Sequence, residues 1–92
     1  MKFMASWSAK PGALREAVGR FLAGKATPPA GVTLLGRWHS VDCSMGFTLY
    51  ESENPAAVYE SAAVWAELLD INTVVVIEDA EAGPVLAKVF AK

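Results

Sequence analysis

The chain of 92 residues is long enough for one small domain, and we take residues 1–92 as that single domain. Hydrophobic residues make up 53% of the chain and charged residues 20%, and the net charge of −2 excludes the basic surface that nucleic-acid binding requires. So large an apolar share indicates that some apolar surface contacts a ligand or a second copy of the chain, and we favour the second copy.

The first part of the chain predicts a strand, a helix and a loop. Apolar and more polar residues alternate over residues 2–8, which is typical of a strand with two different faces. Over residues 13–23 the apolar positions recur every three or four residues, which predicts an amphipathic helix that ends at Gly24. Residues 24–31 are rich in Pro and Gly and form the one substantial loop.

The middle of the chain predicts a β-hairpin. Residues 32–40 and 45–52 are strand-like, and the short segment 41–44 between them has the length of a hairpin turn. We therefore expect these two strands to pair antiparallel, with Trp38 opposite Phe47.

The last part predicts a helix, a strand and a tail. Asn54 is a suitable N-cap and Pro55 a suitable first residue for a helix that extends to about Leu69. The β-branched residues within 71–78 predict a strand. Because proline disrupts a helix interior, Pro84 predicts a turn over 79–83 followed by a short C-terminal helix.

The element order β-α-β-β-α-β predicts a ferredoxin-like α+β domain. Right-handed crossovers place both long helices on one face of a four-stranded antiparallel sheet in the order 4-1-3-2, which leaves the other face uncovered. Strand alternation then assigns each residue to a face. The side under the helices is predicted to hold Phe3, Ala5, Trp7, Leu34, Trp38, Phe47, Leu49, Val75 and Ile77. The uncovered side is predicted to hold Met4, Ser6, Leu35, Arg37, His39, Thr48, Tyr50, Val74 and Val76.

The uncovered side mixes apolar and polar side chains, and this is the composition of a small-molecule pocket. We therefore predict a homodimer whose two sheets face each other and enclose a pocket. The predicted ligand-binding residues are Ser6, Arg37, His39, Thr48 and Tyr50.

The chemistry of this pocket depends on two side chains. His39 is the only histidine and could act as an acid or base near neutral pH, or it could be a structural imidazole at a sheet edge or dimer interface. Arg37 could bind a carboxylate or stabilise an oxyanion, or it could form an ion pair with an acid of the partner or of the tail.

Other classes of site are not indicated. Cys43 and Asp42 lack the further ligands of a zinc site, and the glycines fit no phosphate-binding fingerprint, so we expect neither metal nor cofactor. The longest aliphatic run, residues 74–77, is too short to span a membrane, and no secretory signal is recognisable. A single cysteine is compatible with a reducing compartment, and a cytoplasmic location is expected.

Several segments resemble the bacterial family called domain of unknown function 3303. These are Met1-Lys2-Phe3-Met4 with Trp7, the Pro28-Pro29-x-Gly31-Val32 loop, the run Leu34-Leu35-Gly36-Arg37-Trp38-His39, and Gly46-Phe47. The similarity covers nearly the whole chain. It implies the fold of the dimeric α+β barrel proteins, a group that contains small cofactor-free monooxygenases and muconolactone-isomerase-like enzymes, but it implies no particular reaction.

The sequence thus supports two functional hypotheses. The first is a homodimeric small-molecule-binding module. The alternative is a cofactor-independent monooxygenase- or isomerase-like enzyme that uses His39 as acid/base and Arg37 as anion anchor.

Overall fold

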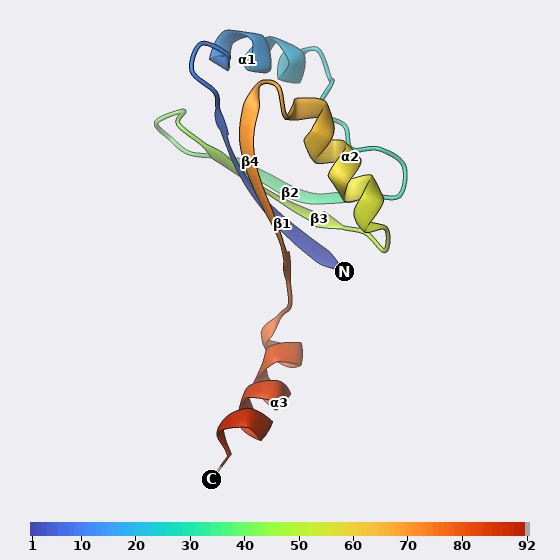
Figure 1. The fold of residues 1–92 in the computed structure, drawn as a ribbon. Coiled ribbons are helices and arrows are strands. Elements are labelled where there is room, and N and C mark those ends of the chain that lie inside the picture. Colours follow the sequence, from blue (N-terminus) through green and yellow to red (C-terminus); the bar gives the residue numbers. More distant parts are fainter. Residues whose placement is uncertain (92) are drawn as a thin grey trace.

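The computed structural model describes residues 1–91, which fold into a βαββαβ unit followed by a third helix (Figure 1). The order of elements agrees with the sequence prediction. Their bounds are β1 (Lys2–Ala9), α1 (Leu14–Leu22), β2 (Thr33–His39), β3 (Gly46–Glu51), α2 (Pro55–Trp65), β4 (Leu69–Val76) and α3 (Asp79–Phe90).

The four strands form one sheet in the order β2-β3-β1-β4, with each neighbouring pair antiparallel. This is the predicted 4-1-3-2 order. Helices α1 and α2 both lie on one side of the sheet (Figure 1). We call this side the covered face and the opposite side the open face. Phe3, Ala5 and Trp7 of β1 belong to the covered face, as predicted.

The core under the helices is small. Its buried cluster consists of Phe3, Val32, Ala57 and Val58, with Tyr50 packed against it. All of these residues lie toward the N-terminal end of β1 and of α2. The other end of the space between sheet and helices therefore has no comparable packing.

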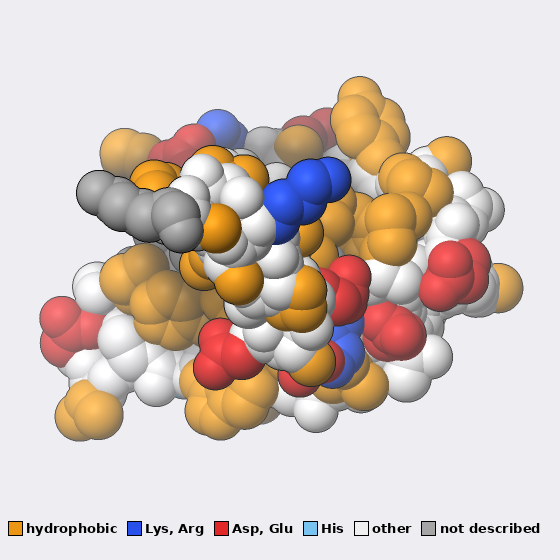
Figure 2. All heavy atoms as spheres, turned by 90° about the horizontal axis from the view of Figure 1, so that it is seen from below, with side chains coloured by type: hydrophobic (Ala, Val, Ile, Leu, Met, Phe, Trp, Pro, Cys, Tyr) orange, Lys and Arg blue, Asp and Glu red, His pale blue; other side chains and the backbone are white. Residues whose placement is uncertain are grey.

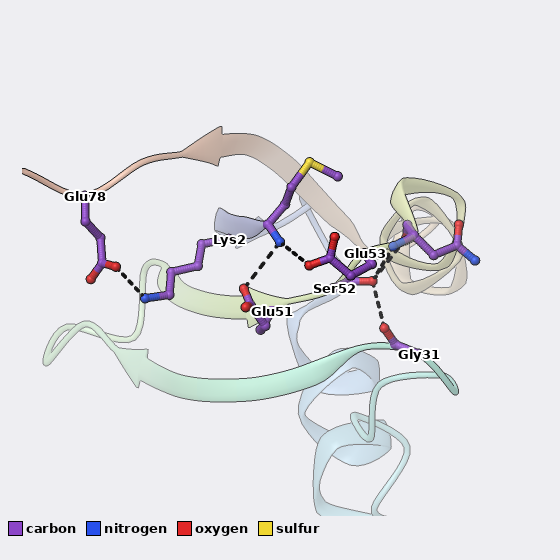
Figure 3. Close-up of polar contacts among 8 residues, drawn as sticks. Lys2, Gly31, Glu51, Ser52, Glu53 and Glu78 are labelled. Carbon is purple, nitrogen blue, oxygen red and sulfur yellow. Dashed lines mark hydrogen bonds and ion pairs between the residues drawn. The ribbon is translucent and has the colours of Figure 1, made fainter. Parts of the chain in front are cut away.

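A buried serine fixes the connections around this core. Ser52, only 4% exposed, donates a 2.7 Å hydrogen bond to the carbonyl of Gly31 and accepts one of 3.0 Å from the backbone N–H of Asn54 (Figure 3). These bonds connect the end of β3 to the loop before β2 and to the start of α2. They help to hold α2 against the sheet at its N-terminal end.

Helix α2 is shorter than predicted, because it ends at Trp65 rather than near Leu69. Leu68, 6% exposed, turns inward, and its carbonyl accepts a 2.8 Å hydrogen bond from the backbone N–H of Lys10. Leu69 then pairs with the end of β1. Strand pairing with β1 thus converts residues with good helix propensity into the start of β4.

The C-terminal segment forms one continuous helix, so the predicted turn over 79–83 is wrong. Helix α3 spans Asp79–Phe90 with Pro84 inside it. Pro84 deprives the carbonyl of Ala80 of its intrahelical donor. Ala80 is exposed, so water can supply the missing hydrogen bond at low cost.

Helix α3 projects from the end of β4 away from the rest of the molecule (Figure 1), and none of its residues is buried. The radius of gyration is 15.7 Å, whereas a compact chain of this length has about 12 Å. At the base of α3, Lys2 Nζ donates a 2.9 Å hydrogen bond to Glu78 (Figure 3), which raises the pKa of Lys2. This ion pair connects Glu78, the residue that precedes α3, to Lys2 of β1.

Candidate functional site

A bulge in β2 decides which side chains of this strand meet the helices. Leu34 lies opposite Tyr50, but the next pair is Gly36 with Leu49, so Leu35 is an extra residue. Beyond such a bulge every side chain changes face relative to simple alternation. Arg37 and His39 therefore lie on the covered face.

The predicted assignment of faces is wrong for most of the hairpin. Trp38 does lie opposite Phe47, as predicted, but both belong to the open face. Because directly opposite residues share a face, the pairing of Phe3 with Tyr50 and of Ala5 with Thr48 places these two β3 residues beneath the helices. The expected pocket between two facing sheets would thus lack Arg37, His39, Thr48 and Tyr50.

His39 lies between two aromatic rings at the end of β2. The Trp7 and Phe21 rings are each 5.4 Å from the imidazole, centre to centre, in edge-to-face arrangements. Phe21 belongs to α1, so the histidine faces the helical layer rather than a second sheet. It is nevertheless exposed, because it lines the opening of the space beneath that helix.

Arg37 is half-buried and held by two contacts. Its guanidinium donates a 2.8 Å hydrogen bond to the carbonyl of Ala26, in the loop after α1. The guanidinium carbon also lies 5.6 Å from the centre of the Phe21 ring, within reach of a cation–π attraction. Loop and helix together thus position this charge next to His39.

Thr48 and Tyr50 have different surroundings. The Thr48 hydroxyl, on a residue only 2% exposed, accepts a 3.0 Å hydrogen bond from the indole N–H of Trp7. Its role is to orient Trp7. The Tyr50 hydroxyl accepts a 3.4 Å hydrogen bond from Ser61 of α2 and can still contact a molecule in front of it.

Ser6 does not join this group. It lies on the open face, where it pairs with Phe47 and Asn72. There it borders a small hollow with Asp70 and Asn72. Its predicted face is correct, but the other four predicted site residues are on the opposite side of the sheet.

A cavity of about 570 Å³ lies between the covered face and helices α1 and α2. Small side chains on the facing surfaces, such as Ala5, Ala17 and Ala62, leave this space unfilled. Gly46 gives the Trp7 ring its position at the wall, because the ring lies where a Cβ of residue 46 would be. Apolar and aromatic residues dominate the wall, including Trp7, Leu14, Val18, Phe21, Val58, Val64, Trp65, Leu69 and Ile71. Arg37, His39, Tyr50 and Ser61 supply polar groups.

The hairpin after His39 forms part of the cavity rim. Ser40, Cys43 and Ser44 line the opening, and Cys43 adopts a φ of 65°. Asp42 fixes this turn by accepting hydrogen bonds from both serine hydroxyls, each 2.7 Å long, and one from the Ser44 backbone. These bonds, those from Ser44 first, lower the pKa of Asp42 to about 2.

Sequence reasoning placed Trp7 under the helices and assigned neither Trp65 nor Phe21 to a site. In the structure all three line the cavity. The usable signal was Gly36, since a glycine within a strand often marks a bulge. A bulge there would have moved Arg37 and His39 to the side of Trp7.

Residues 1–91 contain neither a metal-binding cluster nor a membrane-spanning helix. Among residues 1–91, no three His, Cys, Asp or Glu side chains gather as a metal ion would require. No helix in the part of the chain that the structure describes has the length and hydropathy of a membrane span.

Comparisons with known proteins complete the description. No curated protein matches the chain. Among solved structures, PA3566 from Pseudomonas aeruginosa is similar, with 16% identity, a TM-score of 0.48, and coverage of 84% of this chain and 93% of that one. Rv0793 from Mycobacterium tuberculosis has 14% identity and a TM-score of 0.49 over 86% of this chain and 96% of its own. A candidate antibiotic biosynthesis monooxygenase from Deinococcus radiodurans has 13% identity and a TM-score of 0.49, over 85% and 94% of the two chains.

The family comparison agrees with the resemblance seen in the sequence. The matching family model spans residues 1–90, which is nearly the entire chain. The chain therefore belongs to the family called domain of unknown function 3303.

Proposed function

We propose that this protein binds a small, largely apolar molecule in the cavity between the covered face and helices α1 and α2. The cavity itself is the observation that carries the proposal. Its volume of about 570 Å³ falls within the range of roughly 300–1,000 Å³ that small-molecule sites occupy. Apolar walls with a few convergent polar groups are the composition of such sites.

Three polar side chains are proposed to contact the ligand. Arg37 and His39 come from β2, and the Tyr50 hydroxyl comes from the adjacent β3. Thr48 is proposed to act through Trp7, whose indole it orients. We expect this binding to take place in the cytoplasm, in keeping with the single cysteine of the chain.

The test is to fill the cavity from α2. Ala62 lines the cavity, whereas its neighbour Ala63 is exposed and does not. Ala62→Phe is expected to weaken binding of the uncharged dye N-phenyl-1-naphthylamine by about tenfold or more, since the new ring occupies space the dye needs. Ala63→Phe adds the same ring on the outer side of the helix and is expected to leave the dissociation constant unchanged.

Fluorescence titration measures the dissociation constant of the dye for each of the two variants. Equal binding by the two variants would contradict the proposal, because the dye would then be on the outer surface. Native mass spectrometry of the purified protein would further identify any molecule that co-purifies in the cavity.

The second candidate, a cofactor-independent enzyme, rests on the joint presence of His39 and Arg37 in the wall of one cavity. Their proposed roles are acid/base and anion anchor. His39→Ala is then expected to retain the dye but to abolish turnover of the co-purified molecule or a close analogue. Turnover that persists in His39→Ala would contradict the role of His39 as acid/base, and small-molecule binding would then be the only supported function.

We also propose that the protein is a homodimer joined through its open face. Met4, Leu35, Trp38, Phe47 and Val74 are each more than two-fifths exposed. Figure 2 views the molecule from the end at which α3 projects, and hydrophobic side chains are visible on that side as well. The chain exposes 6508 Å², whereas a monomer of 9.8 kDa exposes about 5,200 Å². The excess, to which the projecting helix α3 contributes, is larger than the roughly 800 Å² that each partner buries in a standard interface.

Light scattering during size exclusion tests the dimer. Phe47→Glu places a charge on the open face and is expected to produce a monomer, because an unpaired charge is costly in an apolar interface. Tyr59→Glu is the control, as Tyr59 is 78% exposed on α2. A dimer that survives Phe47→Glu would contradict an interface at this face.

A further inference from the structure

We infer that the ligand of this cavity is an organic acid, with an apolar body and a carboxylate or similar anionic group that binds Arg37. The inference rests on the proposed function and specifies its ligand class.

The first argument is that the charge of Arg37 has no carboxylate partner. Arg37 is half-buried, and among residues 1–91 no acidic side chain lies within ion-pair distance of it. The carbonyl of Ala26 accepts one of its five N–H donors. The remaining donors of the planar guanidinium suit a planar anion such as a carboxylate, which can accept two parallel N–H bonds.

The second argument is the charge of the cavity wall. The chain as a whole is acidic, with a net charge of −2. The cavity wall has the opposite balance, because it contains two cationic side chains, Arg37 and Lys25, and only one carboxylate, that of Glu60. A wall with more positive than negative groups favours an anionic ligand.

The third argument is the order of polarity across the sheet. β2, at one edge, contributes Arg37 and His39, and β3 contributes the Tyr50 hydroxyl. β4, at the opposite edge, contributes the apolar side chains of Leu69 and Ile71 and, as its single polar group, the Thr73 hydroxyl. A molecule with one anionic end and an apolar remainder therefore matches the cavity with its acid toward β2.

Arg37 is also held in place. Its contacts with the Ala26 carbonyl and the Phe21 ring come from the loop and helix that close this end of the cavity. A side chain that is already ordered loses little conformational entropy when it binds an anion.

Two dyes of the same shape test the charge preference. 8-Anilino-1-naphthalenesulfonate differs from uncharged N-phenyl-1-naphthylamine only by its sulfonate, which stands in for a carboxylate. The wild-type protein is expected to bind the sulfonate about tenfold more tightly, as a charge-assisted hydrogen bond allows. Competition by 2-naphthoate against 2-naphthamide repeats the comparison with a true carboxylate, and 2-naphthoate is expected to compete more strongly.

Variants of Arg37 and Lys25 show which side chain causes the preference for the anionic dye. Arg37→Met keeps an apolar stem and is expected to abolish the preference for the sulfonate, measured as the ratio of the dissociation constants of the two dyes in the same variant. Arg37→Lys is expected to keep part of the preference, because it retains the charge without the planar fork. Lys25→Met is expected to reduce the preference less than Arg37→Met does, because Lys25 is exposed and solvent and salt screen its charge.

The outcomes separate the two proposals. If the uncharged dye binds and Ala62→Phe weakens it, but the wild type does not prefer the anion, only the organic-acid inference is wrong. A preference that persists in Arg37→Met also overturns it. If Arg37→Met loses both dyes through misfolding, the wild-type competition by 2-naphthoate and 2-naphthamide decides. Failure of the uncharged dye to reach the cavity would instead refute the proposed function.

Discussion

The two faces of the sheet differ in a way that reverses a common expectation. The covered face, which two helices shield, surrounds a cavity and carries Arg37 and His39. The open face, which no helix shields, carries Trp38 at 56% exposure and Phe47 at 41%. Trp38 and Phe47 therefore lie where no helix covers them, whereas the polar side chains of Arg37 and His39 lie beneath the helices. Shielding by helices in this molecule thus leaves a cavity rather than a filled core.

The difference between the faces originates in one residue. Without the extra residue Leu35, regular alternation would keep Leu34 and Trp38 on one face. With it, Trp38 turns away from the helices and its neighbours turn toward them.

The glycines next to the two tryptophans give the most direct comparison. A Cβ at Gly46 would collide with the Trp7 ring on the covered face, and a Cβ at Gly36 would collide with the Trp38 ring on the open face. Gly46→Ala is expected to lower the free energy of unfolding by about 2 kcal/mol, because the hydrogen bond to Thr48 holds Trp7 in place. Gly36→Ala is expected to cost less than about 1 kcal/mol, because Trp38 is half-exposed and can rotate away.

Urea denaturation at equal protein concentrations measures both free energies. Circular dichroism of the native proteins controls for a change of fold. Equal losses at the two glycines would show that the rings are held equally firmly on both faces, which would contradict the comparison.

The hydrogen bond between Trp7 and Thr48 predicts a smaller effect. In a double-mutant cycle, Trp7→Phe and Thr48→Val are expected to show a coupling of about 1 kcal/mol, since each removes the same hydrogen bond. Denaturant unfolding of the four proteins provides the cycle. A coupling near zero would mean that Thr48 does not orient Trp7.

The hairpin at the cavity opening predicts the smallest effect. Hydrogen bonds from Ser44 and Ser40 lower the pKa of Asp42 from 3.8 to about 2, so they favour the charged carboxylate. Their contribution is therefore fully present above pH 3.8 and is lost as the pH falls through about 2. Hydrogen exchange at the Ser44 amide is expected to accelerate over this interval, relative to the intrinsic rate, as the turn loosens.

Asp42→Asn provides the control for this titration. It removes the titrating group, and the exchange of Ser44 is then expected to follow the intrinsic pH dependence throughout. An acceleration that persists in Asp42→Asn would assign the effect to general acid unfolding instead.

Much of the fold was predictable because local patterns agree with it. Alternation in β1, the Asn54-Pro55 start of α2 and the β-branched run in β4 each act over a few residues. Errors arose where tertiary contacts outweighed local preference. Pairing with β1 recruited Leu69 into a strand, and exposure to water let Pro84 remain inside a helix.

The candidate site was predictable in its residues but not in its place. Arg37, His39 and Tyr50 were identified by their chemistry, and they do line one cavity. Their side of the sheet was predicted wrongly, because alternation carries no information about an inserted residue. Phe21 was missed for a related reason: an apolar residue on an amphipathic helix looks the same whether it fills a core or borders a cavity.

Residue types and short-range periodicity were enough to predict the order of strands and helices, the family, and four polar residues, Arg37, His39, Thr48 and Tyr50, that line one cavity. The tertiary structure alone decided that those side chains face the helices and that a cavity lies there. Those features depend on the register between β2 and β3 and on how closely two helices of small residues approach the sheet, and both are set by contacts between segments far apart in the chain.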